Sequence, residues 1–224
     1  MRLVTVAHGT RHTAGNQVAR DLTAAAGELL GVPAAAAYVE LCAPSLPEAL
    51  AESDEPTVVV PLLLSTGHHV RHDLPEAVSA AGGPVALGPP LGPHRLLAKA
   101  QAHRLLQAGA RPGQPVVMVA AGSRDPLATS DLTRAAELLA ELWRGPVTVA
   151  TLGGIGHRPE ALVTGDCAVS PYLLADGHFA DRVRGSCAAA GAVAEVLGPH
   201  GALRDLVVRR FREAVREVSP SAVA

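Results

Sequence analysis

Short apolar runs alternate with longer segments of helical periodicity along the whole chain. The runs are apolar at successive positions, which is typical of strands buried on both faces of a parallel sheet. The alternation predicts right-handed βαβ units and helices on both sides of each sheet. We predict strands over 3–8, 35–41, 57–65, 84–88, 116–122, 147–153, 167–175 and 192–198, and helices over about 13–30, 44–53, 73–81, 94–109, 126–143, 159–164, 178–190 and 200–217.

The same pattern is written twice. Four motif pairs keep their order at offsets of 113, 112, 110 and 106 residues: VAHGTR (6–11) with VAAGSR (119–124), LPEAL (46–50) with RPEAL (158–162), PLLLSTGH (61–68) with PYLLADGH (171–178), and LGPH (91–94) with LGPH (197–200). A Gly/Pro-rich stretch, GARPGQP (109–115), suits a linker. We therefore predict an α/β fold of two similar Rossmann-like domains, residues 1–112 and 113–224, each with a mostly parallel four-stranded sheet.

Composition argues against several classes of binding partner. The 224 residues carry a formal net charge of −2 and only 2% of them are aromatic, which argues against nucleic-acid binding. The three cysteines are widely spaced without a CxxC pair, so no structural zinc or iron–sulfur site is indicated and a reducing compartment fits. MRLVTVAHGTRH leads directly into a strand, with neither a leader nor a membrane-length apolar run. We expect a soluble cytoplasmic protein with no membrane or nucleic-acid partner.

Side chains that can bind a metal or transfer protons lie at the predicted strand ends of the first repeat. His8 closes the first predicted strand, Glu40 closes the second, and the pair His68–His69 follows the third. Because ligands bind beyond the carboxyl ends of parallel strands, these residues can share one crevice. Two imidazoles and a carboxylate can bind a divalent transition metal and accept protons.

The two repeats differ at these positions. His8 corresponds to Ala121 and His69 to Phe179, whereas His68 and His94 correspond to the histidines at 178 and 200. Histidines kept in both copies are best explained by shared architecture, and those lost together form a chemical unit. The first repeat is thus predicted to hold the working site, with the second as scaffold.

Simpler interpretations stay open for several residues. A histidine after a strand is often a turn residue bonded to backbone, and Glu40 can be an ordinary solvated carboxylate. Arg71 and His72 fall before a helix start where Asp73 and Glu76 have capping-box spacing. TLGGIGHRPE (151–160) lacks the third glycine of a dinucleotide fingerprint and the acidic residue that follows it, so a dinucleotide site is not predicted.

Three segments together resemble the sirohydrochlorin chelatase family, the ATP-independent enzymes that insert a metal into a tetrapyrrole. They are HGTR (8–11), ELCAPSLPEAL (40–50) and VVVPLLLSTGHHVRHDLPEA (58–77). The resemblance covers most of residues 1–110 and extends more faintly into the second half. It is similar to the long, internally duplicated form of the family.

The resemblance implies roles for individual residues. His8 would bind metal and accept a pyrrole proton, His69 would be the other metal-binding histidine, and Glu40 would contact the substrate. The residues implied along the macrocycle are Leu64, Ser65, Thr66, Gly67, His68 and His69. Because sirohydrochlorin is a polycarboxylate, cationic groups at the rim are expected to help bind it, with Arg11, Arg71 and His72 as candidates.

The sequence thus predicts an enzyme that inserts Fe²⁺ or Co²⁺ into sirohydrochlorin or a related tetrapyrrole, for siroheme or cobalamin synthesis. Neutral imidazole suits this task near pH 7, as a base and as a ligand that releases the metal. Nickel insertion is the alternative within the class, since the donor set accepts any late first-row divalent ion. A non-catalytic metal or tetrapyrrole carrier and a two-lobed small-molecule binder are the rivals. We expect no cofactor beyond the divalent metal (Fe²⁺, Co²⁺ or Ni²⁺) that serves as substrate, and the fused halves permit a monomer.

Overall fold

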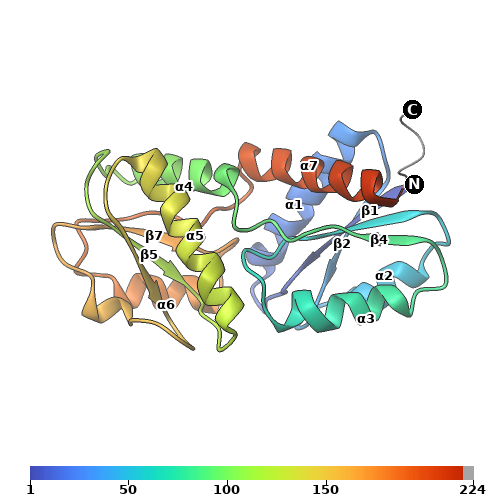
Figure 1. Cartoon of the computed structure of the whole chain (residues 1–224), viewed down its shortest axis with the longest axis horizontal. Coiled ribbons are helices and arrows are strands. Elements are labelled where there is room, and N and C mark those ends of the chain that lie inside the picture. The colour runs from blue at the N-terminus through green and yellow to red at the C-terminus, as the bar shows by residue number, and fades with distance from the viewer. Residues whose placement is uncertain (219–224) are drawn as a thin grey trace. The chain divides into compact units, whose positions relative to one another are not determined.

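The computed structural model describes residues 1–218, in which strands and helices alternate as predicted (Figure 1). The first repeat contains β1 (Arg2–Ala7), α1 (Thr13–Leu30), β2 (Ala34–Tyr38), α2 (Leu46–Ala51), β3 (Thr57–Pro61), a π-helical turn (His69–Asp73), α3 (Leu74–Ser79), β4 (Val85–Leu87) and α4 (Arg95–Gln107). The second contains β5 (Val116–Ala120), α5 (Pro126–Trp143), β6 (Val147–Thr151), a 3₁₀ turn (Pro159–Ala161), β7 (Ala168–Tyr172), α6 (His178–Ser186), β8 (Ala192–Val193) and α7 (Gly201–Val218).

Each repeat forms its own four-stranded, fully parallel sheet. The strand orders are β2-β1-β3-β4 and β6-β5-β7-β8, so the topology repeats along with the sequence. In the first sheet Val4 of β1 lies opposite both Ala35 of β2 and Val59 of β3. The chain leaves β1 toward β2 on one side and later adds β3 on the other. The carboxyl ends of β1 and β3 therefore flank a topological switch point, where open α/β sheets bind ligands.

The predicted fold class is confirmed, and the compact units differ from the sequence repeats by one helix each. One unit is Met1–Leu91 together with the helix from Leu203, and the other is Gly92–Ala202. The helix after the fourth strand of each repeat thus belongs to the unit of the other repeat. The expected domains of 1–112 and 113–224 follow the repeat instead, and residues 219–224 of the second lie outside the described part of the chain.

Side-chain contacts show how these two helices belong to their units. In α4, Leu105 is buried with Val116, Leu139 and Trp143, and the Gln101 side chain donates a hydrogen bond to Ser170 of β7 at 3.0 Å. In the first unit, Arg210 of α7 donates a hydrogen bond to the Leu91 carbonyl, and the α7 backbone at Arg210 packs against Gly88. Neither repeat alone contains every helix of a compact unit.

Two layers of helices cover the first sheet. Val4, Val6 and Val59 form a core with apolar side chains of α2 and α3, among them Leu46, Leu50 and Leu74. On the opposite face, Thr5 of β1 is hydrogen-bonded to Thr23 of α1 at 2.6 Å, and α1 and α7 cover this face (Figure 1). The second sheet is built alike, with α6 on one face and α4 and α5 on the other.

The elements differ from the predicted ones mainly at strand ends, and the helix predicted over 159–164 was wrong, because only the 3₁₀ turn Pro159–Ala161 forms there. The third strand ends at Pro61 rather than 65, and β8 spans only Ala192–Val193. The third helix starts earlier than predicted, since the π-helical turn from His69 runs straight into α3. Asp73 is therefore helical, with φ −66° and ψ −43°, and its side chain makes no capping hydrogen bond. The capping interpretation of Asp73 and Glu76 was wrong.

Candidate metal site at the carboxyl edge of the first sheet

His8 and Glu40 are brought together because β1 and β2 keep pairing beyond their formal ends. The Val39 amide donates to the Ala7 carbonyl at 2.9 Å, and the Glu40 amide donates to the His8 carbonyl at 3.1 Å. The two side chains meet above this edge, with 3.2 Å between His8 Nε2 and Glu40 Oε1.

Gly9 makes this close approach sterically feasible. Its φ is +92°, and a Cβ built at this position would lie 2.0 Å from the Glu40 carbonyl oxygen. Any L side chain would meet both the strained backbone conformation and the clash. The glycine after His8 thus serves to seat Glu40 beside the histidine.

His69 reaches the same place from the π-helical turn that follows β3. Its ring stands edge-on to that of His8, with centroids 5.1 Å apart and an interplanar angle of 85°. Asp73, one turn further along, is hydrogen-bonded to His69 Nδ1 at 2.5 Å. A carboxylate acceptor keeps the proton on Nδ1 and leaves the Nε2 lone pair available to a metal. π-Helical turns of this kind occur frequently at functional sites.

The three side chains can act as one ligand set. Donor atoms of His8, Glu40 and His69 all lie within 4.8 Å of one another. Two imidazoles and one carboxylate suit late first-row divalent metals, and three protein ligands leave coordination positions for further donors. The side chains are 46%, 50% and 31% exposed, so the set opens to solvent and to a bulky ligand.

The remaining predicted residues surround this cluster or lie beside it in the chain. Leu64, Ser65, Thr66 and Gly67 are half-buried in the segment between β3 and the π-helical turn. His68 is exposed, and its Nε2 lies 3.6 Å from Asp73 Oδ1. Arg11, Arg71 and His72 are exposed as well. Their substrate-binding roles stay predictions, as do the roles of the three cluster residues.

Sequence reasoning missed Asp73 as part of the site. A signal was present, because Asp73 stands four residues after His69, and at the repeat offset of 110 it corresponds to Val183. Residues four apart on a helix are neighbours, so the pair was recognisable once a helix was assumed over both.

The second unit keeps the backbone of the site without its chemistry. Leu152 and Gly153 donate to the carbonyls of Ala120 and Ala121, both at 3.0 Å, as Val39 and Glu40 do in the first unit. Ala121 thus occupies the place of His8, and Gly153 that of Glu40. Gly122 repeats the approach of Gly9, with φ +88° and a would-be Cβ 1.9 Å from the Gly153 carbonyl.

The two histidines of the LGPH motifs serve helix starts. His94 Nδ1 accepts the Leu96 amide at 3.1 Å at the start of α4, and His200 Nδ1 accepts the Ala202 amide at 3.0 Å at the start of α7. The LGPH motif is therefore a helix-capping device in both copies, which agrees with the architectural role expected from the repeat comparison.

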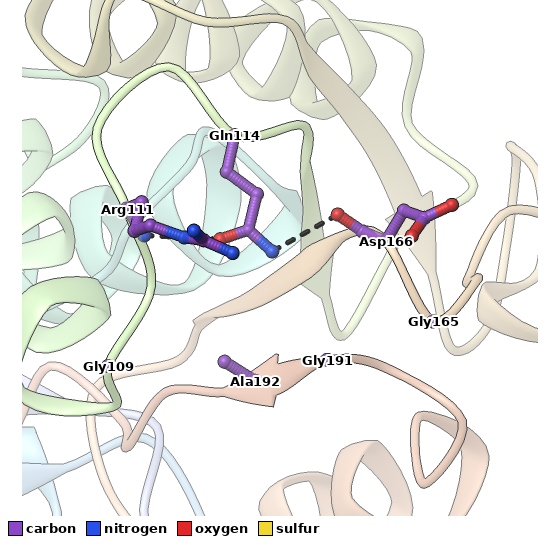
Figure 2. Close-up of a pocket in the computed structure, with 7 residues that line it drawn as sticks. All are labelled: Gly109, Arg111, Gln114, Gly165, Asp166, Gly191 and Ala192. Carbon is purple, nitrogen blue, oxygen red and sulfur yellow. Dashed lines mark hydrogen bonds between the residues drawn. The ribbon is translucent and has the colours of Figure 1, made fainter.

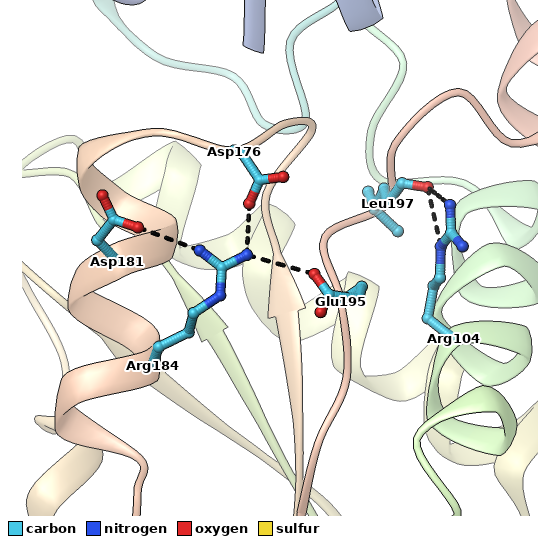
Figure 3. Close-up of polar contacts among 6 residues, drawn as sticks. All are labelled: Arg104, Asp176, Asp181, Arg184, Glu195 and Leu197. Carbon is cyan, nitrogen blue, oxygen red and sulfur yellow. Dashed lines mark hydrogen bonds and ion pairs between the residues drawn. The ribbon is translucent and has the colours of Figure 1, made fainter. Parts of the chain in front are cut away.

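Charges past the strand ends of the second unit are used for ion pairs. Arg184 contacts Asp176 after β7 at 2.5 Å, Asp181 of α6 at 3.1 Å and Glu195 after β8 at 3.3 Å (Figure 3). The hydrogen bond with Asp176 raises the pKa of Arg184. These contacts are exposed and tie loops to α6, and they include no metal-binding imidazole.

A cavity of about 420 Å³ lies elsewhere, at the amino edge of the second sheet (Figure 2). Gln114 at its rim donates to the Asp166 carbonyl at 3.1 Å. The lining residues are Gly109, Arg111, Gln114, Gly165, Asp166, Gly191 and Ala192. None of them belongs to the predicted site, so the cavity is separate from the candidate chemistry.

No helix within residues 1–218 is long and apolar enough to cross a membrane.

Comparison with known structures agrees with this fold. The structure of SirB from Bacillus subtilis with Fe³⁺ matches with a TM-score of 0.80 and 26% identity, covering 97% of each chain. The structure of CbiX, described as the terminal enzyme for biosynthesis of siroheme in denitrifying bacteria, matches at 0.77 and 20% identity, covering 96% of this chain and 99% of that one. The second likeness shows the fold alone. The fold is that of the chelatase-like tandem α/β proteins.

Sequence comparison finds similarity over the first repeat. Residues 2–108 match the model of the CbiX family. The sirohydrochlorin ferrochelatase of Bacillus subtilis (strain 168) is 36% identical over 90 residues, which are 38% of this chain and 34% of that protein. The aligned part thus spans about a third of the curated relative. Residues 2–108, nearly the whole first repeat and a little under half of the chain, are thus similar to the CbiX family, which agrees with the resemblance to sirohydrochlorin chelatases.

Proposed function

We propose that this protein inserts Fe²⁺ or Co²⁺ into sirohydrochlorin or a closely related tetrapyrrole. The observation that carries the proposal is the convergence of His8, Glu40 and His69 at the switch point of the first sheet. Its support from relatives is a ferrochelatase that acts on sirohydrochlorin and a related structure that holds iron.

The ligand set fits the chemistry of metal insertion. Two pyrrole N–H groups each lose a proton while the macrocycle nitrogens replace protein ligands on the metal. His8 and Glu40, 3.2 Å apart, offer an imidazole and a carboxylate that can take up those protons. Neutral imidazoles hold the ion less tightly than a set of thiolates would, so the ion can pass to the macrocycle.

The half-buried segment Leu64–Gly67 lies in the chain between the sheet and His69, and we propose that the macrocycle lies along it. Arg11 and Arg71 are the cationic groups proposed to meet substrate carboxylates. Replacing both is expected to raise the KM for tetrapyrrole, and an unchanged KM would remove this part of the proposal.

The metal is not fixed by the donor set, and nickel stays an alternative because these ligands follow the general affinity order for late divalent ions. We propose that no further cofactor is needed. The cytoplasmic location and the monomeric state that the fused halves permit are also parts of this proposal.

The experiment is anaerobic. Sirohydrochlorin is mixed with Fe²⁺, Co²⁺ or Ni²⁺, and the visible spectrum is followed for the wild type, His8→Ala and a protein-free control. Metallation faster than the control and lost in His8→Ala supports a chelatase with its site in the first repeat. Tight tetrapyrrole binding without acceleration by any of the metals would instead indicate a carrier.

A further inference from the structure

Two histidines outside the three-ligand cluster form a pair of their own. His68 and His72 are four residues apart along the π-helical turn, and their ring centroids are 4.7 Å apart with an interplanar angle of 35°. The His68 side chain is 74% exposed, and His72 is exposed too. Both rings are thus open to ions in solution.

Two histidines four residues apart on one helical face can present their nitrogens to a single divalent metal. Two neutral donors bind such an ion more weakly than the three ligands His8, Glu40 and His69, and water fills the other positions. We infer that His68 and His72 form an outer docking pair for a divalent transition metal. This inference rests on the proposed function, because it makes the pair the first stop of the metal on its way to the cluster.

Asp73 links the outer pair to the cluster. One of its carboxylate oxygens is hydrogen-bonded to His69 Nδ1, and the other lies 3.6 Å from His68 Nε2. Ring centroids are 6.4 Å apart from His68 to His69 and 5.1 Å apart from His69 to His8. The ion can therefore exchange ligands over short steps, beside a negative charge throughout.

The repeat comparison favours a chemical role for His72, the member of the pair that differs between the copies. At the offset of 110 residues, His68 corresponds to His178, while His72 corresponds to Arg182. The second unit thus keeps one imidazole and has a guanidinium, which cannot bind a metal, in place of the other. The pair occurs only in the unit that also has the cluster.

A rival role for these residues is to provide positive charge for substrate carboxylates. The substitution His72→Arg separates the two roles, because arginine keeps the charge and removes the metal ligand. It also places at position 72 the residue type that the other repeat has there, so the turn is expected to accept it.

The first test measures Co²⁺ binding without tetrapyrrole, by titration calorimetry, in a His8→Ala/His69→Ala background that lacks the cluster. We expect this background to bind about one equivalent weakly, and His72→Arg or His68→Gln to abolish that binding. The matched control is His157→Gln, an exposed histidine of the second unit, which should leave it intact. No binding in the background, or binding that survives His72→Arg, would overturn the inference.

The second test uses otherwise wild-type protein and varies the metal at fixed tetrapyrrole. His72→Arg is expected to raise the KM for metal by roughly threefold or more, with a smaller change in the rate at saturating metal. An unchanged KM for metal would overturn the docking role. Failure of the proposed function gives a different result, because the wild type itself would then show no metallation while the binding titration still reports on the pair.

Discussion

The two sheets of this protein have matching backbone at their carboxyl edges, and yet, within residues 1–218, the candidate metal ligands lie at the edge of the first sheet alone. His8–Gly9 and Ala121–Gly122 follow equivalent strands, and each glycine passes so close to a carbonyl of the neighbouring strand that a Cβ would lie within 2.0 Å. The hydrogen bonds that extend the strand pairing recur as well. The difference lies in the side chains at four positions: His8, Glu40, His69 and Asp73 against Ala121, Gly153, Phe179 and Val183.

This difference separates what the fold requires from what the chemistry requires. Features found at both edges, such as the positive-φ glycines and the capping histidines of LGPH, hold backbone in place. Features found at only one edge are not required by the fold, so function can explain them. The second unit lacks the three candidate ligands and also the carboxylate that supports one of them. This joint absence is expected if the four side chains act as one chemical unit.

The largest expected difference is between removing a candidate ligand from the first edge and removing its counterpart from the second. His69→Ala should lower the metallation rate by at least ~100-fold, since loss of a ligand exceeds the 10–100-fold effect typical of a supporting group. Phe179→Ala, at the matching and exposed position, should change it by less than about twofold. Rates are followed by the visible spectrum of the tetrapyrrole. Equal losses in both variants would show that both edges take part in the reaction.

A smaller effect is expected from the carboxylate behind the ligand. Asp73→Ala should weaken Co²⁺ binding at the cluster by about 10–100-fold, because His69 loses the acceptor that fixes its tautomer and orientation. Binding is measured by titration without tetrapyrrole, and Asp73→Asn, which keeps an acceptor oxygen, should recover part of the affinity. Glu76→Ala, in the first turn of α3, controls for damage to the helix. If Asp73→Ala binds Co²⁺ like the wild type, the carboxylate does not support His69.

Most of the fold was readable from the sequence because buried parallel strands leave an uninterrupted apolar signal. The helices over 13–30 and 126–143 were predicted at the bounds that α1 and α5 have. The exchange of α4 and α7 between units left no such signal. Both helices follow the same LGPH cap, and the sheet that each one covers is decided by long-range contacts such as that of Gln101 with Ser170. Helix propensity and hydrophobic periodicity predict that a helix forms, but not which sheet it packs against.

The candidate site was readable to a similar degree. Strand ends located His8 and Glu40, because parallel topology alone places them at one edge. Asp73 was misread because its spacing to Glu76 suits a capping box. A π-helical turn departs locally from regular helical hydrogen bonding, and residue patterns do not predict it. Because the helix starts with this turn, Asp73 lies inside it and bonds to His69 instead of capping its start.

The paired glycines give a third, moderate effect that separates stability from activity. Gly9→Ala and Gly122→Ala should each destabilise the protein by about 2 kcal/mol or more, because both glycines have φ near +90° and face a backbone carbonyl. Thermal or urea unfolding measures this cost. Only Gly9→Ala should also slow metallation below the unfolding temperature, because only there does the displaced strand end carry a ligand, Glu40. A comparable slowing in Gly122→Ala would mean that the second edge is coupled to the chemistry.

The smallest expected effect is a gain, and it tests whether the second edge still has the geometry to bind a metal. Ala121→His, Gly153→Glu and Phe179→His would supply the three missing ligands, and a Cβ at Gly153 has ordinary van der Waals room, with its nearest neighbour at 3.6 Å. The triple substitution is made in a protein that also carries His8→Ala, His69→Ala and His72→Arg, which remove the proposed metal sites of the first unit. We expect it to restore weak binding of one Co²⁺ ion per chain, measured by the visible absorption of the bound ion. Its affinity should stay below that of the natural cluster by about 10–100-fold, because Val183 supplies no carboxylate to orient the new imidazole at 179. The triple substitution without Ala121→His controls for ions held by the other two groups. If no Co²⁺ is bound, the backbone that the two edges share is not enough to bring three ligands together. The π-helical turn that positions His69 would then matter more for metal binding than the strand ends do.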